Sequence, residues 1–189
     1  MYNSKIAFIV FILVAAVQLF VPVKMVLDRE NILTAGKKYK FKTAPVDPSD
    51  PFRGKYITLD FAANTVKVDD KNAWENMETV FLQISNDAEG FAKIDTVTKQ
   101  EPASGRDFIK AKINYVSYDS LLHIDYPFDK YYMEESKAPD AEKTYREYNR
   151  DTTHKTYALV SIKNGEAVLK DVMIDDISIK EIIKKQKQQ

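Results

Sequence analysis

The sequence of 189 residues contains no cysteine, and it has only two histidines, five glycines and one tryptophan. The absence of cysteine excludes disulfide bonds, c-type haem attachment, thiolate nucleophiles and cysteine-based zinc sites. It is also compatible with an oxidising compartment. The chain must therefore obtain its stability from the burial of apolar side chains.

Candidate metal and cofactor motifs are equally scarce. His123 and His154 stand at no recognised metal-ligand spacing, and no HExxH, GxSxG, P-loop or dinucleotide fingerprint occurs. A composite site of His123, Asp125 and a distant glutamate stays open, although a lone strand histidine is more often packed or exposed. We expect no metal site and no cofactor.

Charge is balanced, with 28 basic and 28 acidic residues. A nucleic-acid-binding protein usually carries a clear basic excess, so the balance argues against a nucleic-acid partner.

One long apolar run, from Ile6 to Val23, carries no charge and a single polar residue, Gln18. As a helix rising about 1.5 Å per residue, it nearly spans a hydrocarbon core of roughly 30 Å. A cleaved signal peptide is the main alternative, but no A-x-A site follows Ala15 and Ala16. A buried soluble helix would show a polar face, which this run lacks. We predict an uncleaved signal anchor over residues 1–27, and therefore a single-pass protein of the cytoplasmic membrane.

The orientation of this anchor is suggested by its position. The basic residues after the run outnumber Lys5 before it, which by charge alone favours the opposite orientation. Asp28 and Glu30 dilute that charge, however, and an anchor at the extreme N-terminus usually commits the following domain to export. We expect the N-terminus inside and the C-terminal domain in the periplasm or cell exterior.

Residues 28–183 read as a single mainly β domain of antiparallel sheets or a partly closed barrel, with one short helix. Alternating side chains and turn signals predict the strands, which are 38–43, 55–62, 64–68, 79–85, 92–98, 108–116, 121–126, 156–163 and 166–174. Asn164-Gly165 predicts a tight hairpin, and Ala138 to Asn149 a helix with Pro139 in its first turn. We expect 25–35 to be a continuation of the anchor or a linker, 177–183 a last strand or a frayed end, and 184–189 a solvated tail.

The stretch from Val46 to Phe61, VDPSDPFRGKYITLDF, is unusually rich in turn-forming proline and glycine residues. Pro48 and Pro51 restrict their own φ and that of the preceding aspartates, and Gly54 is conformationally permissive. An alternation then begins, with apolar side chains at Ile57, Leu59 and Phe61. Such a pattern indicates a positioned turn that leads into a half-buried strand.

This stretch resembles the GDYXXLXY family of bacterial membrane-anchored proteins, whose motif follows a DPxDPxRG-like segment. The matching residues are Asp47, Pro48, Asp50, Pro51, Arg53, Gly54, Tyr56 and Leu59. Lys55 replaces the family aspartate and Phe61 the final tyrosine, so neither an aspartate carboxylate nor the last hydroxyl acts here. The resemblance brings no biochemical activity with it.

A second block also resembles the family, with an aromatic pair, Tyr131 and Tyr132, before Glu135 and a further glutamate, Glu142, seven residues later. Paired carboxylates roughly 5 to 9.5 Å apart can serve as general acid and base in glycoside hydrolysis. The more common reading is structural, with Glu142 near a helix N-terminus and Glu135 paired with Arg53 or a lysine. Ser49 and Lys55 would suit a serine–lysine peptidase, but the flanking sequence gives no support.

We therefore expect a non-catalytic accessory or interaction subunit of a membrane partner, plausibly a polytopic protein, as the resemblance implies. Its docking face would include Arg53, Tyr56 and the 131–142 block. Tyr56 could equally pack on the short helix through Tyr145 or Tyr148. The alternative is an envelope hydrolase that uses Glu135 and Glu142.

Overall fold

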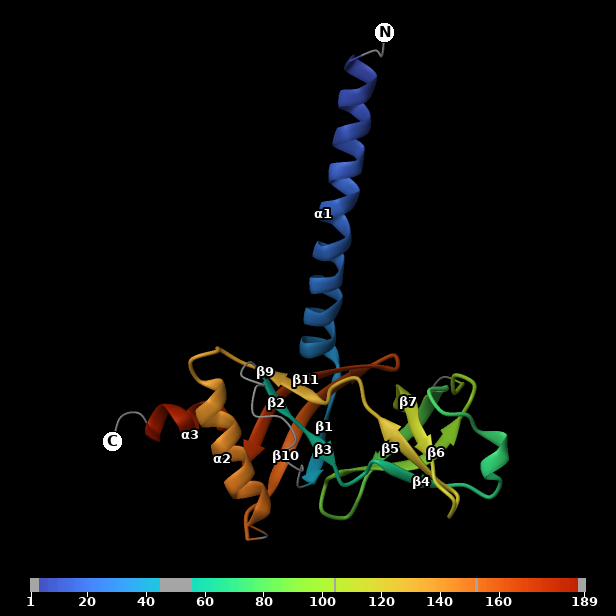
Figure 1. The fold of residues 1–189 in the computed structure, drawn as a ribbon, viewed down its shortest axis with the longest axis vertical. Helices are drawn as coiled ribbons and strands as arrows, with labels where there is room; N and C mark the ends of the chain where they lie inside the picture. Colours follow the sequence, from blue (N-terminus) through green and yellow to red (C-terminus); the bar gives the residue numbers. More distant parts are fainter. Residues whose placement is uncertain (1–3, 45–55, 104, 152, 187–189) are drawn as a thin grey trace.

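The computed structural model describes residues 4–44, 56–103, 105–151 and 153–186, and it shows one long N-terminal helix that leads into a mainly β domain (Figure 1). Two five-stranded antiparallel sheets and one two-stranded sheet make up this domain. The predicted β-rich fold with an N-terminal apolar helix is therefore confirmed. The helices are more numerous than expected.

Helix α1 (Ser4–Ala35) extends well beyond the apolar run, so 25–35 continues the anchor as helix rather than as an irregular linker. Its apolar side chains from Ile6 to Leu27 are exposed, and Ile32 is its only buried residue among those described. A helix that is apolar on all sides and uncovered by protein suits a lipid environment. This suggests a single-pass membrane anchor.

The first sheet has the order β12-β11-β10-β1-β3 and receives the anchor directly. Its strands are β1 (Lys37–Ala44), β3 (Asp60–Phe61), β10 (Thr156–Lys163), β11 (Glu166–Ile174) and β12 (Ile177–Ser178). Only Gly36 separates α1 from β1. Asn164 and Gly165 have φ of 51° and 80° between β10 and β11, which confirms the predicted hairpin and its left-handed turn.

The second sheet has the order β4-β8-β7-β5-β6 and contains the strands that the sequence predicts over 64–68, 79–85, 92–98, 108–116 and 121–126. The elements of this half are β4 (Thr65–Lys67), the 3-10 turn η1 (Lys71–Ala73), β5 (Thr79–Asn86), β6 (Ala92–Thr98), β7 (Phe108–Val116) and β8 (Leu121–Asp125).

The strand expected over 55–62 is divided between two sheets. β2 (Tyr56–Thr58) pairs with β9 (Lys130–Tyr132), whereas β3 pairs with β1 through Thr43 and Phe61. Between them the Leu59 amide donates to the carbonyl of Asp129 at 2.7 Å. Ile57, Leu59 and Phe61 are all buried, as the alternation predicts, but only β3 pairs with β1.

The expectation of a last strand or a frayed end over 177–183 holds only for the strand at 177–178, and it is wrong for the remainder. After the two residues of β12 the chain forms α3 (Ile179–Gln186), which contacts α2 (Ala138–Arg150), the predicted short helix. Ile179 and Ile183 are four residues apart and both buried, the spacing of one helix face. Residues 184–186 of the expected tail form the exposed end of this helix.

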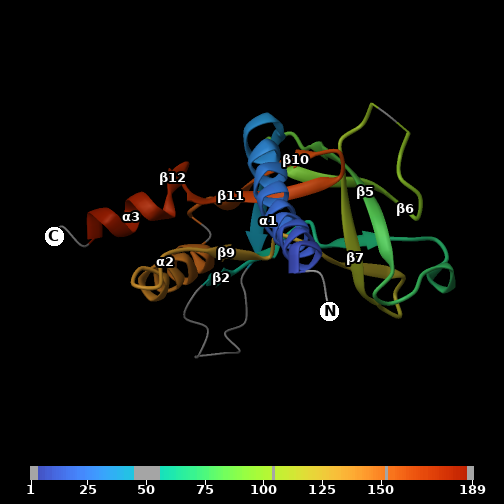
Figure 2. The ribbon, with the colours of Figure 1, turned by 90° about the horizontal axis from the view of Figure 1, so that it is seen from above.

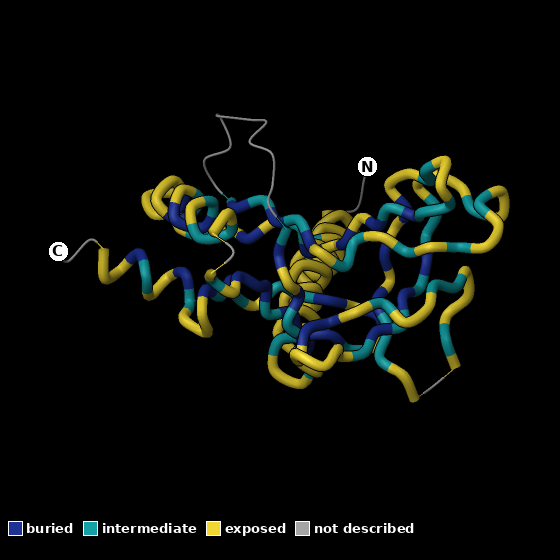
Figure 3. The backbone as a smooth tube through the Cα atoms, turned by 90° about the horizontal axis from the view of Figure 1, so that it is seen from below, coloured by how far each residue is buried: buried dark blue, intermediate teal, exposed yellow. Residues whose placement is uncertain are grey.

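The core joins the two sheets through four aromatic rings. Their centroids lie 5.0 to 5.8 Å apart, and the rings belong to Phe41, Phe61, Tyr126 and Phe128. Buried polar groups are also paired: Asn149 on α2 donates to the Ala44 carbonyl at 2.8 Å and accepts from Thr43 at 2.9 Å. Figure 3 shows the buried stretches along the strands and the exposed residues along α1 and the loops.

Gly36 is required where the anchor meets the sheet. A Cβ at this position would lie 2.3 Å from the Ile32 carbonyl oxygen and 3.0 Å from that of Ile162, both main-chain atoms. We expect Gly36→Ala to lower the stability of the full-length protein by about 1–3 kcal/mol, because the clash forces α1 away from β10. Thermal unfolding in detergent measures this, with exposed Ala35→Ser as the control. Equal melting temperatures for the two variants would contradict the steric argument.

Candidate functional site

The structure describes part of the predicted motif. Tyr56 lies on β2 and Leu59 follows it, whereas Asp47, Asp50, Arg53 and Gly54 lie outside the described residues, as do Ser49 and Lys55. Leu59 is 4% exposed and belongs to the core. The second block is described throughout, from Lys130 on β9 to Glu142 on α2.

Tyr56, Lys130 and Tyr132 form a small surface group that we call the aromatic patch. Tyr56 and Tyr132 are directly opposed in the β2–β9 pairing, with ring centroids 5.4 Å apart. Lys130 Nζ lies 5.7 Å from the centre of the Tyr56 ring, within range of a cation–π contact. Tyr132 is 67% exposed. Exposed tyrosines are enriched at contact surfaces between proteins, whereas lysines such as Lys130 are depleted there.

The described residues give Tyr56 the ring of Tyr132 as its aromatic neighbour, rather than Tyr145 or Tyr148. Tyr145 is buried, and its hydroxyl accepts from Asn149 at 3.2 Å. Tyr148 packs edge-on against His154, with 4.7 Å between ring centroids. The α2 tyrosines therefore support the domain from within, while Tyr56 contributes to the surface.

Tyr131 points to the opposite face of β9. Its hydroxyl donates to Asp171 Oδ1 at 2.6 Å, and burial together with this carboxylate raises the pKa of Tyr131 well above its ordinary value. Lys180 of α3 lies 5.2 Å from the centre of the ring. Tyr131 thus links β9 to β11 and α3, a structural role that leaves only Tyr132 of the predicted pair at the surface.

The two predicted glutamates occupy different surroundings. Glu135 is exposed in the turn between β9 and α2. Glu142, one turn inside α2, accepts from Arg146 Nη2 at 2.6 Å. A groove of about 370 Å³ beside Glu142 is lined by α2 residues alone, from Pro139 to Arg150. The described geometry thus gives Glu142 an intrahelical partner, an arrangement typical of helix stabilisation.

Each histidine contacts another side chain. His123 stacks on Tyr115 with centroids 4.0 Å apart, and His154 Nδ1 lies 2.5 Å from Asp175 Oδ2. Hydrogen bonding to His154 holds the pKa of the Asp175 carboxyl below its usual range. Within the described ranges no three histidine, aspartate or glutamate residues come together as a metal site would require.

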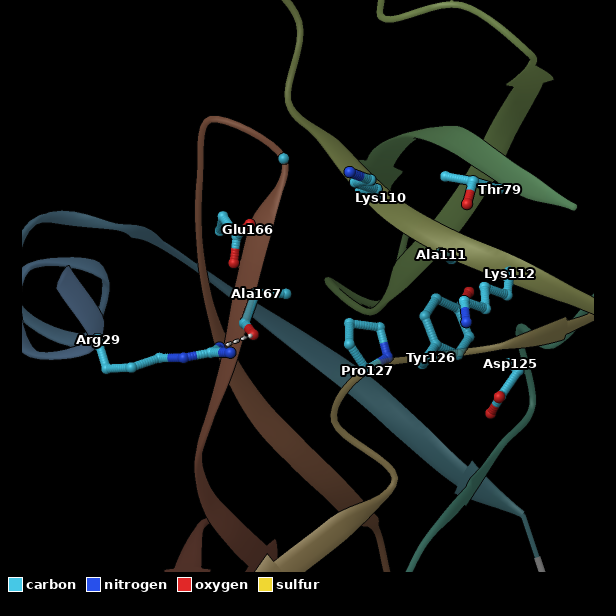
Figure 4. Close-up of a pocket in the computed structure, with 11 residues that line it drawn as sticks. Arg29, Thr79, Lys110, Ala111, Lys112, Asp125, Tyr126, Pro127, Glu166 and Ala167 are labelled. Carbon is cyan, nitrogen blue, oxygen red and sulfur yellow. Dashed lines mark hydrogen bonds between the residues drawn. The ribbon is translucent and has the colours of Figure 1, made fainter. Parts of the chain in front are cut away.

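A pocket of about 400 Å³ opens where α1 meets the domain, and the sequence did not predict it (Figure 4). We call it the anchor pocket. It is lined by charged and by apolar residues, namely Arg29, Thr79, Lys110, Ala111, Lys112, Asp125, Tyr126, Pro127, Gly165, Glu166 and Ala167. The sequence signal for it is weak: Lys110 and Lys112 alternate with buried residues on β7, a pattern shared by any strand with one wet face.

The last turns of α1 are fastened to the first sheet. Arg29 Nη1 donates to the Ala167 carbonyl of β11 at 3.4 Å, and Lys163 Nζ of β10 donates to Asn31 Oδ1 at 2.9 Å. The Gly36 amide closes the last turn of α1 itself by donating to the Ile32 carbonyl at 2.9 Å. Figure 2, seen from above, shows α1 over the domain beside β10 and β11. The anchor therefore continues into the fold without a linker.

Comparison of the sequence with known protein families identifies the same family as the motif does. No curated protein and no solved structure matches the chain. The model of the GDYXXLXY protein family matches residues 18–172, from within the apolar helix to the end of β11. Because this match covers most of the chain, the protein belongs to the GDYXXLXY family.

Proposed function

We propose that the protein is a membrane-anchored, non-catalytic interaction subunit that holds its β domain against the membrane surface for a polytopic membrane partner. The observation that carries the proposal is the continuity of α1 with the first sheet. A domain joined to its anchor by Gly36 alone, and bonded to it through Arg29 and Lys163, is held at a fixed height. That arrangement suits a subunit that presents a surface to a neighbour in the same membrane.

The aromatic patch is the docking surface that we assign to the domain. Figure 1 shows β9 at about the height at which α1 ends, and Figure 2 shows the β2–β9 pair to one side of that end, so the patch would be open to a neighbour that stands beside the anchor. Tyrosine contributes a large contact area with few rotatable bonds, and aromatic residues are enriched at interfaces. The predicted glutamates support this reading over a hydrolase, because Glu142 is bonded to Arg146 and Glu135 is exposed in a turn.

A second contact would lie within the membrane. Gln18 is the only polar residue between Ile6 and Val23, and Pro22 stands four positions later in the same helix. Proline has no amide hydrogen, so the carbonyl of Gln18 lacks its normal helical donor. A carboxamide and a freed carbonyl at one level of a lipid-exposed helix are costly unless a neighbouring helix supplies hydrogen bonds. Gln18 is therefore a suitable point of contact for a transmembrane helix of the partner.

The domain would face the periplasm or the cell exterior. The charge after the apolar run, which argues for the opposite orientation, is reduced locally because Lys24 pairs with Asp28 at 2.6 Å. The lack of cysteine also suits an oxidising compartment.

Orientation can be measured directly because the chain has no cysteine. Tyr118 is 96% exposed at the β7–β8 turn, so we expect Tyr118→Cys to react with a membrane-impermeant maleimide once the outer permeability barrier is opened. Ser4→Cys, at the start of α1, should react only after the cytoplasmic membrane is lysed. The reverse pattern would place the domain in the cytoplasm and remove an exported partner from consideration.

The aromatic patch can be tested by crosslinking in intact cells, followed by affinity recovery in mild detergent and mass spectrometry. We expect Tyr132→Ala and Tyr56→Ala to reduce recovery of one membrane protein by about fivefold or more, since interface tyrosines often contribute over 1 kcal/mol. Tyr118→Ala is the control, because it removes an exposed tyrosine at the β7–β8 turn, outside the aromatic patch. A recovered set that is empty, or unchanged in both patch variants, would rule this surface out.

The intramembrane contact is tested separately in the same assay. We expect Gln18→Leu to weaken recovery of the partner by about threefold, because interhelical hydrogen bonds in membranes contribute about 0.6 kcal/mol on average. Val21→Leu, which changes apolar bulk without removing a polar group, should leave recovery unchanged. If Gln18→Leu recovers the partner as well as the wild type does, Gln18 is not part of the contact.

A further inference from the structure

The anchor pocket lies at a depth that can be estimated from α1. With a rise of about 1.5 Å per residue, the helix covers roughly 35 Å from Ile6 to Arg29. The hydrocarbon core is about 30 Å thick, and the headgroup layer adds about 5–7 Å on each side. If the core begins at Ile6, next to Lys5, then Arg29 stands within the opposite headgroup layer. The pocket that Arg29 lines is at the level of lipid phosphates.

The walls of the pocket come from three parts of the fold. Arg29 reaches in from α1, Lys110 and Lys112 come from neighbouring outward positions of β7, and Glu166 follows the β10–β11 turn (Figure 4). Pro127 and the edge of the buried Tyr126 ring provide an apolar wall between them. At about 400 Å³ the space falls at the small end of the range for ligand sites, about 300–1,000 Å³.

Five charged side chains line this space, and two of them, Lys112 and Asp125, are directly opposed in the β7–β8 pairing. In the described part of the chain, no ion pair joins any of the charged lining residues, which are Arg29, Lys110, Lys112, Asp125 and Glu166. Arg29 makes a single long hydrogen bond, 3.4 Å to the Ala167 carbonyl. Three cations and two carboxylates thus line one opening.

We propose that the anchor pocket binds a phospholipid headgroup. The phosphodiester would lie against Arg29, Lys110 and Lys112, and a hydrogen-bond-donating substituent, an ammonium or a hydroxyl group, would face Asp125 and Glu166. Arginine and lysine form charge-assisted hydrogen bonds with phosphate, and carboxylates accept hydrogen bonds from such donors. The pocket therefore selects phosphatidylethanolamine and phosphatidylglycerol over phosphatidylcholine, whose quaternary ammonium has no donor. The proposal depends on membrane anchoring and not on a protein partner.

The test uses the full-length protein in detergent micelles, with lipids of identical acyl chains added one at a time and retained lipid counted by native mass spectrometry. We expect phosphatidylethanolamine and phosphatidylglycerol to be retained about fivefold more than phosphatidylcholine, the size expected from one or two charge-assisted hydrogen bonds. Arg29→Gln and Lys112→Gln should remove this preference. Lys67→Gln, which deletes one exposed charge on β4, is the matched control. Equal retention of the three lipids, or equal loss in the Lys67 variant, overturns the proposal.

Two further arms separate a lipid from a soluble ligand and from a folding defect. Inorganic phosphate is added as a competitor at the lipid concentration, and displacement of the lipid would assign the pocket to free phosphate instead. Asp125→Asn leaves every cation in place, so it should reduce retention of phosphatidylethanolamine more than that of phosphatidylglycerol. If Asp125→Asn affects neither lipid while Arg29→Gln affects all three equally, the pocket has no headgroup selectivity. Melting temperatures of all variants confirm that they fold.

Discussion

The structure depends on the junction between α1 and the first sheet. A single residue, Gly36, turns the chain from helix into strand, and a side chain there would overlap the backbone of both Ile32 and Ile162. Because no linker absorbs motion at this point, the height and tilt of the domain follow those of the anchor. Ile32, the buried residue of α1, and the hydrogen bonds from Arg29 and Lys163 reinforce the junction. A membrane-spanning helix is in this way part of the domain's own packing.

Packing inside the domain extends that constraint to both sheets. β1 begins at the junction and carries Phe41, whose ring contacts Phe61 of β3 as well as Tyr126 and Phe128 from the chain that follows β8. The aromatic cluster therefore connects the anchor-bearing sheet with the second sheet. Asn149 and Thr43 connect α2 to the same strand by hydrogen bonds. Displacement of α1 would therefore disturb the packing of both sheets.

Much of this fold could be predicted from local patterns, and the failures have definite causes. Period-two alternation placed most strands, and the Asn164-Gly165 turn was identified because its left-handed backbone favours those residues. The segment 177–183 was misread because isoleucines at 177, 179 and 183 fit a strand at one spacing and a helix at another. The alternation of apolar side chains also did not reveal that segment 55–62 pairs with β9 before Leu59 and with β1 after it. Alternation identifies a strand but not its pairing partner, and β9 lies some 70 positions away in the sequence.

The candidate surfaces were less predictable, because they form only in three dimensions. Tyr56 and Tyr132 were named from separate motifs, but their direct opposition in one strand pair is a product of folding. The anchor pocket requires Arg29, Lys112 and Glu166 to meet from distant parts of the chain. From the sequence alone, each of these residues is indistinguishable from any other exposed charged residue.

The two proposed surfaces are linked by one physical argument. If α1 spans the bilayer, a domain with no linker would keep one side toward it, and only groups on that side could contact lipid headgroups or the membrane-proximal loops of a neighbour. The pocket includes a residue of α1 itself, and β9, which carries Tyr132 of the aromatic patch, is at about the height at which α1 ends in Figure 1. Headgroups at the pocket would fix the depth of the domain. A fixed depth would in turn set the height at which Tyr132 meets a partner, so that lipid binding and protein docking would stabilise the same orientation.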